Sequence, residues 1–156
     1  MRTGGTIRRS VIMVTVTLFS IVPVLAGAWG VGPFENDPAL DWLADLVDQD
    51  DTRRVYETLE QATAVPYIDV DIGSAAIAAA EVVAAFRGRP SKNLPKELTS
   101  WVGSDRHGPS ESQLELARKV VQLVASSEQS ELRDLWADVG DEQWQASLGD
   151  LQKRLK

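Results

Sequence analysis

Apolar residues recur with the spacing of amphipathic helices over most of the chain after residue 36. Ala39, Leu43 and Leu46 fall on one helical face, and the same period returns from residue 110 onward. No stretch alternates between apolar and polar residues for long enough to indicate a strand. The pattern predicts an all-α protein, a single-domain bundle of about six or seven helices within residues 27–156.

Prolines, glycines and capping residues set the expected helix ends. Asp37-Pro38 is typical of an N-cap followed by the first helical residue, and Ser110 with Gln113 forms a capping box. The predicted helices span about residues 37–48, 52–64, 71–87, 95–102 and 110–126, followed by one helix on each side of residue 140.

Alanine dominates the predicted helix 71–87 and covers most of its faces. Small side chains let neighbouring backbones approach closely, so we expect this helix at the centre of the bundle. Glu81 lies inside the alanine run, and a buried carboxylate needs a partner, for which Arg87, Arg89 or a backbone amide are the expected candidates. We interpret Glu81 as part of a structural ion pair or of the helix rim, with an active carboxylate as the alternative.

The first 26 residues have the layout of a secretory signal. A short segment with three arginines precedes an apolar run from Val11 to Leu25, and small residues follow it. Fifteen helical residues span only about 22 Å, short of a hydrocarbon core of about 30 Å, so a membrane anchor is the weaker interpretation. We expect a signal peptide at residues 1–26 and an exported protein, periplasmic, in the cell envelope or secreted, that contacts membrane only through this segment.

Two alternatives stay open at the N-terminus. Cleavage after Ala26 leaves Gly27 at the new end, whereas cleavage after Ala28 leaves Trp29 there. The start codon can also be assigned too early, in which case Val24 or Leu25 is the true initiator and the protein is cytoplasmic.

The stretch from residue 27 to residue 43 combines closely spaced glycines with large aromatic side chains. Its candidate recognition or structural residues are Trp29, Gly30, Gly32, Phe34, Glu35, Asn36, Asp37 and Trp42. One interpretation is a plug that folds onto the bundle, with aromatic anchors that contribute about 2–3 kcal/mol each on burial. The other is a recognition loop that presents the polar groups of residues 35–37 at the surface.

This opening motif resembles that of a bacterial family known as domain of unknown function 4259. Gly-Ala-Trp-Gly-Val-Gly-Pro-Phe-Glu-Asn-Asp at residues 27–37, followed by Asp41-Trp42, carries the resemblance, and the alanine-rich run 78–85 and the segments around Trp101, Trp136 and Trp144 continue it. Members of the family usually begin at the motif itself in a cytosolic form, so the 26 preceding residues are a departure. The resemblance implies kinship and fold, and it brings no established activity.

Composition and charge narrow the classes of function. The chain has 16 basic and 23 acidic residues, and residues 1–28 hold three of the arginines and no acid, so the remainder carries a formal charge of −10. Such a charge repels phosphate backbones and disfavours nucleic-acid binding. There is no cysteine, which excludes disulfides and thiolate sites. No phosphate loop, dinucleotide fingerprint or paired-histidine helix is present, so we expect no cofactor and no metal.

Two weak site patterns have more ordinary explanations. Asp69-x-Asp71-x-Gly73 lacks the remaining ligands of a calcium loop, so we interpret Asp71 as a helix cap. The only histidine, His107, lies in a polar loop without a nucleophile elbow, so we interpret it as a solvated loop residue.

Two function hypotheses remain. The first is a non-catalytic binding or interaction module with an acidic surface and an unknown protein partner, which predicts no deep polar cavity. The second is a carboxylate-dependent hydrolase-like enzyme, which predicts a concave site that joins at least two of Glu35, Asp37, Glu81 and His107.

Overall fold

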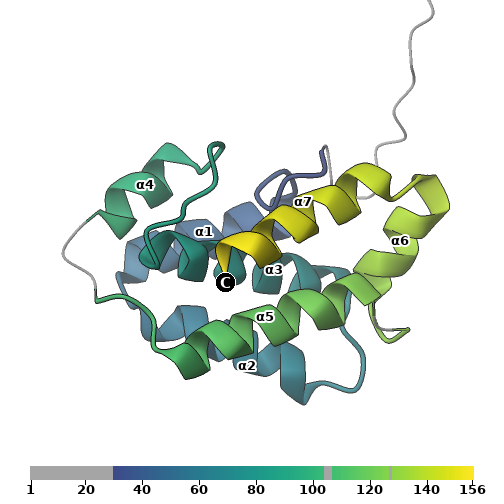
Figure 1. Ribbon diagram of the computed structural model, residues 1–156, viewed down its shortest axis with the longest axis horizontal. Helices are drawn as coiled ribbons and strands as arrows, with labels where there is room; N and C mark the ends of the chain where they lie inside the picture. Colours follow the sequence, from purple (N-terminus) through teal and green to yellow (C-terminus); the bar gives the residue numbers. More distant parts are fainter. Residues whose placement is uncertain (1–29, 104–106, 127) are drawn as a thin grey trace, which may run out of the picture.

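Seven helices make up the part of the chain that the computed structural model describes, which comprises residues 30–103, 107–126 and 128–156 (Figure 1). They are α1 (Asp37–Gln49), α2 (Arg53–Ala64), α3 (Val70–Phe86), α4 (Lys96–Val102), α5 (Glu111–Ser126), α6 (Glu131–Val139) and α7 (Glu142–Arg154). No strand forms within these ranges, and the predicted all-α bundle is confirmed. The predicted signal at residues 1–26 and Trp29 lie outside the described residues.

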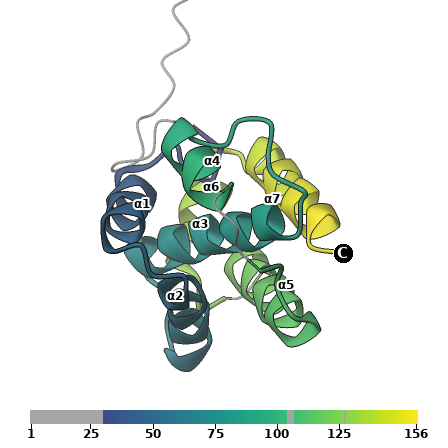
Figure 2. The same cartoon turned by 90° about the vertical axis from the view of Figure 1, so that its left-hand side faces the viewer.

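The alanine-rich helix α3 runs through the middle of the protein and contacts every other helix (Figure 2). Its residues 73, 74 and 76–85 are all buried. Because alanine side chains are short, the surrounding helices can approach this backbone from several directions at once. The predicted central position is confirmed, and it leaves Glu81 with only 1% of its surface exposed.

Two helices begin one or two residues away from the predicted caps. Asn36 caps α1, because its backbone is extended and its side chain accepts a hydrogen bond from the Ala39 N–H at 2.9 Å, so Asp37 is the first helical residue instead. Asp69 caps α3, accepting from an N–H at 2.8 Å, and Asp71 lies in the first turn. The predicted capping roles of Asp37 and Asp71 are therefore wrong.

The corner between α1 and α2 is tied to α4 by a tryptophan. Asp50 ends α1 in the left-handed region, with φ of 48°, and its carboxylate accepts a hydrogen bond from the Trp101 indole N–H at 2.8 Å. A second buried indole, that of Trp42, donates to the Thr58 hydroxyl at 2.9 Å and joins α1 to α2. Trp42 is thus part of the core.

Helix α7 is held along α5 by polar contacts at both ends. The Gln145 side chain donates to the Ala125 carbonyl at 3.2 Å, and the Gln152 side chain donates to the Arg118 carbonyl at 2.9 Å. Arg118 in turn donates to the Leu155 carbonyl at 2.9 Å. These contacts hold α7 and its C-terminal end beside α5. Within the described ranges, no helix combines the length and apolarity required to cross a bilayer.

Candidate functional site

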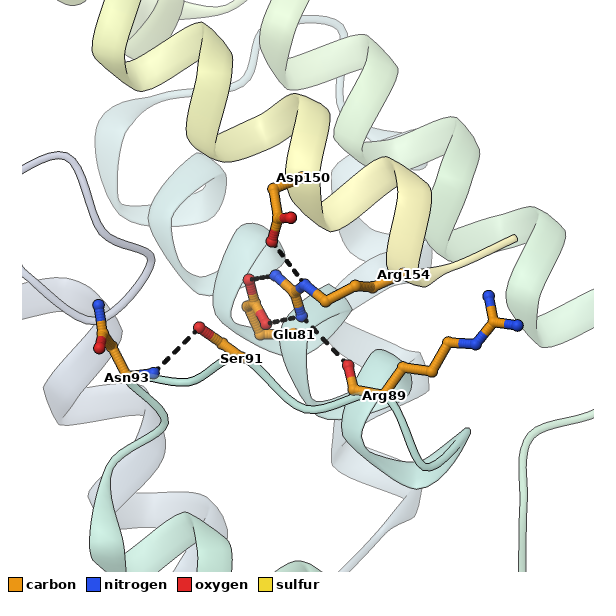
Figure 3. Close-up of polar contacts among 6 residues, drawn as sticks. All are labelled: Glu81, Arg89, Ser91, Asn93, Asp150 and Arg154. Atoms are coloured by element: carbon orange, nitrogen blue, oxygen red, sulfur yellow. Dashed lines mark hydrogen bonds and ion pairs between the residues drawn. The ribbon is translucent and has the colours of Figure 1, made fainter.

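The buried Glu81 carboxylate forms a two-point ion pair with Arg154 of α7 (Figure 3). Arg154 Nη1 lies 2.7 Å from Glu81 Oε2, and Nη2 lies 2.5 Å from Oε1. The prediction that the side chain of Arg87 or Arg89 pairs with Glu81 is wrong. Arg89 contributes only its backbone carbonyl, which lies 3.4 Å from Arg154 Nη1. A contact across 73 residues cannot be read from local sequence, because it depends on how α7 packs.

The guanidinium of Arg154 is also held from the solvent side. Its Nε donates to Asp150 Oδ2 at 2.7 Å, one helical turn earlier on α7. Burial alone lowers the pKa of Arg154, but the hydrogen bonds and negative charges of Glu81 and Asp150 outweigh it, and the pKa is raised. The guanidinium therefore stays charged and keeps a fixed orientation.

A cavity of about 440 Å³, the Glu81 cavity, lies over this ion pair. Its walls come from the segment before α1, from α3, from the loop between α3 and α4, and from α7. The apolar side chains in its lining are Val31, Pro33, Phe34 and Pro95. The polar ones are Glu35, Ser91, Asn93, Ser147 and Asp150, together with the Glu81–Arg154 pair. Figure 3 shows Glu81 of α3, Asp150 and Arg154 of α7, and the loop with Ser91 and Asn93 beside them.

The opening segment, residues 30–36, folds around the Glu35 carboxylate. Glu35 Oε2 accepts a hydrogen bond from the Gly32 N–H at 2.8 Å, and the Glu35 N–H donates to the Gly32 carbonyl at 3.0 Å. A Cβ at Gly30 would overlap with Glu35 Oε2. Two glycines are thus needed for the carboxylate to fold back on its own loop.

The opening segment has features of both interpretations drawn from the sequence. Phe34 is half-buried against the core, as a plug requires, while Glu35 is exposed at the rim of the Glu81 cavity, as a recognition loop requires. Asn36 caps α1, whereas Asp37 is exposed in its first turn and does not line the cavity.

The same segment covers a second, smaller cavity of about 30 Å³ on its other side. Val31, Gly32 and Pro33 line both cavities, so this part of the chain separates them. The second cavity is mostly apolar and includes Ser74, whose buried hydroxyl has no hydrogen-bond partner in the described part of the chain. Its volume suits one or two water molecules.

The two function hypotheses differ in the cavity that they predict. Glu35 and Glu81 line one cavity, which is the juxtaposition that the hydrolase hypothesis requires, while His107 is exposed and does not line it. The binding hypothesis predicted no deep polar cavity, and the lining of the Glu81 cavity combines polar and apolar side chains. Among the described residues, no group of three or more histidines and acids is arranged to hold a metal ion.

Sequence reasoning missed half of this site. Asp150, Arg154 and Ser147 lie on a helix that reads as an ordinary amphipathic surface helix. The one available signal is the spacing of Asp150 and Arg154, since opposite charges four residues apart pair on a helix. Ser91 and Asn93 lie in a loop whose position only the folded chain defines.

Comparison with protein families matches residues 27–147 to Domain of unknown function (DUF4259). The match includes the opening segment and all of α3, and it ends before Asp150 and Arg154. Comparisons with curated proteins and with solved structures give no significant match. Since the match spans most of the chain, the protein belongs to the DUF4259 family.

Proposed function

We propose that the protein is a non-catalytic binding module whose ligand lies in the Glu81 cavity. The arrangement of Glu81 carries the proposal, because both of its carboxylate oxygens accept hydrogen bonds from one guanidinium. A carboxylate held in this way is a fixed, charged acceptor and not a free general base. The cavity floor is therefore preorganised for binding, with a shape set by helices α3 and α7 and two loops.

The acidic surface supports a neutral or cationic ligand or protein partner. Four aspartates of α1, at positions 37, 41, 45 and 48, are all exposed. Residues 29–156 carry the formal charge of −10 described above, since all acids of the chain fall within them. Such a field repels anions and argues against nucleic acid as a partner.

The proposal includes export through residues 1–26, which rests on the order of arginines, apolar run and small residues in the sequence. The test is the intact mass and N-terminal sequence of the native protein from separated cell fractions. A chain that begins at Gly27 or Trp29 outside the cytoplasm supports export. A chain that begins near Val24 in the cytoplasm, or an uncleaved chain in the membrane fraction, contradicts it.

A bulky side chain placed in the cavity tests the binding site. Ser147 lines the cavity from α7, and its neighbour Ala146 is exposed on the same helix and does not. We expect small molecules that raise the unfolding temperature of the wild type to raise that of Ala146→Trp equally, and to have no effect on Ser147→Trp. The measurement is a thermal-shift screen with neutral sugars, amines, amino acids and carboxylates. Ligands that stabilise both variants equally bind elsewhere and contradict the proposal.

One observation favours a hydrolase-like enzyme as the second candidate, namely that Glu35 and Glu81 share a cavity. Two carboxylates in one cavity can act as the general acid and the general base of a hydrolysis reaction. Compounds that bind in the screen are incubated with protein and followed by mass spectrometry. Turnover by the wild type that is lost in both Glu35→Gln and Glu81→Gln supports the enzyme, and unchanged compounds support the binding module.

A further inference from the structure

The lining of the Glu81 cavity combines apolar and polar side chains. The apolar ones are Val31, Pro33 and Phe34 of the opening segment and Pro95 at the start of α4. Most of the polar ones come from α3, α7 and the loop after α3. A ligand that uses both kinds of side chain carries apolar surface as well as polar groups.

The polar groups that have no protein partner include both donors and acceptors. Within the described part of the chain, Glu35 Oε1 and Asp150 Oδ1 accept no hydrogen bond from protein, since only the other oxygen of each is used. The side-chain amide of Asn93 and the hydroxyl of Ser147 are also without a protein partner there. A ligand hydroxyl both donates and accepts, so it can bond to the carboxylate oxygens and also to the N–H groups of the Asn93 amide. An ammonium only donates, so it cannot accept a hydrogen bond from that amide.

The charge of the lining disfavours anionic ligands. Among the described residues, the lining holds three carboxylates, those of Glu35, Glu81 and Asp150, and one guanidinium, that of Arg154. The guanidinium is already occupied by Glu81 and Asp150. A carboxylate or phosphate on the ligand would therefore meet like charges, with no free cation among these residues to bind it.

From these three observations we infer that the cavity binds a neutral polyhydroxylated ring, of the size of a mono- or disaccharide. The C–H face of the ring packs on Phe34 and the prolines, and its hydroxyls bond to Glu35, Asn93 and Asp150. A volume of about 440 Å³ falls in the range of small-molecule sites, about 300–1,000 Å³. The inference rests on the proposed binding function and names its ligand class.

The test is a titration of the full chain with glucose, galactose, mannose, maltose and cellobiose, observed by saturation-transfer NMR and calorimetry. We expect at least one neutral sugar to bind with a Kd of about 1 mM or below. Glucuronate, which adds a carboxylate, is expected to bind at least tenfold more weakly than the neutral sugar. Asn93→Ala is expected to weaken sugar binding about threefold to tenfold, since it removes one or two hydrogen bonds. Gln143→Ala, at an exposed position of α7 outside the cavity, serves as the matched control and should change nothing.

The remaining outcomes separate the ligand class from the binding function. Glucosamine that binds more than tenfold tighter than glucose overturns the inference, because ammonium recognition then dominates. If no sugar binds, while other compounds stabilise the wild type but not Ser147→Trp, the inferred ligand class is wrong and the proposed binding function still holds. A screen in which no compound distinguishes Ser147→Trp from Ala146→Trp overturns both.

Discussion

Glu81 and Arg154 are separated by 73 residues in the chain, yet their side chains meet through two parallel hydrogen bonds of 2.5 and 2.7 Å. The glutamate comes from the central helix and is 1% exposed, whereas the arginine comes from the last helix and is 15% exposed. This pair joins the C-terminal helix to the centre of the bundle and forms the floor of the Glu81 cavity.

Removing one member of this pair should destabilise the fold more than replacing both. Arg154→Met leaves the Glu81 carboxylate buried without its partner, at a cost of about 3–5 kcal/mol. Glu81→Leu should cost less, because Arg154 retains Asp150 and some contact with water. The double variant Glu81→Leu/Arg154→Met should recover more than half of the loss seen in Arg154→Met.

Chemical denaturation of the four proteins in this cycle gives the coupling free energy. Arg53→Met is the control, since Arg53 pairs with Asp51 on the surface with 80% of its side chain exposed and should contribute little. Additive effects of the two buried substitutions would mean that the pair does not hold α7 in place.

The indole of Trp101 gives a second prediction, at the corner after α1. Asp50→Ala removes the acceptor 2.8 Å from the indole nitrogen and places alanine at a φ of 48°, so we expect a loss of about 2–4 kcal/mol. Asp50→Asn keeps an acceptor and tolerates this backbone, and it should stay close to the wild type. Thermal unfolding checks this, with exposed Asp48→Ala on α1 as the control. Equal losses for Asn and Ala at position 50 would contradict the assigned hydrogen bond.

The helices and the centre of the bundle can be predicted because they follow from local chemistry. The helical period, the capping box at Ser110 and the alanine run 75–85 each act within a few residues. The cap of α1 differs from the prediction by one residue because Asn36 and Asp37 both carry a capping oxygen, and only the backbone conformation distinguishes them.

From the sequence, the site can be predicted only at a residue whose type is unusual within its own helix. Glu81 stands out because a carboxylate among alanines needs a partner, but the partner's identity depends on tertiary packing. Arg87 is the nearer candidate in the sequence, and in the structure it instead donates to the backbone carbonyl of Lys156. The cavity itself depends on the return of α7 and the path of the loop after α3, for which no local pattern exists.

The glycine at position 30 should control the position of Glu35 without controlling the fold. In Gly30→Ala the new Cβ would overlap with Glu35 Oε2, so the flexible carboxylate must move away and release the Gly32 N–H. We expect faster hydrogen exchange at the Gly32 amide, with an unfolding temperature near that of the wild type. Glu35→Gln, which can keep an oxygen at this place, should retain more of the protection.

Gly149→Ala is the matched control for that substitution. Apart from the backbone of its own helix α7, nothing lies within 4 Å of the position that a Cβ would take there, so alanine should stabilise the helix by about 0.5–1 kcal/mol. A large loss of stability in Gly30→Ala would mean that the opening segment is a structural plug and that its polar groups are secondary.

The ion pair between Glu111 and Arg118 on α5 gives a pH prediction. Arg118 Nη2 lies 2.6 Å from Glu111 Oε1, and this hydrogen bond is the main reason that the pKa of Glu111 lies below its ordinary value of 4.5. A carboxyl with a lowered pKa in the folded state stabilises the fold fully above its unfolded pKa, and the contribution disappears as the pH falls through the folded value. Urea denaturation between about pH 3 and pH 7 should therefore show that the free energies of unfolding of wild type and Glu111→Gln differ most at neutral pH and converge in acid.

Glu115→Gln, at an exposed position on the same helix, is the control and should show no such convergence. Because the Glu111 side chain is 68% exposed, added salt should shrink the neutral-pH difference, and a gap that is constant with pH would contradict the assigned ion pair.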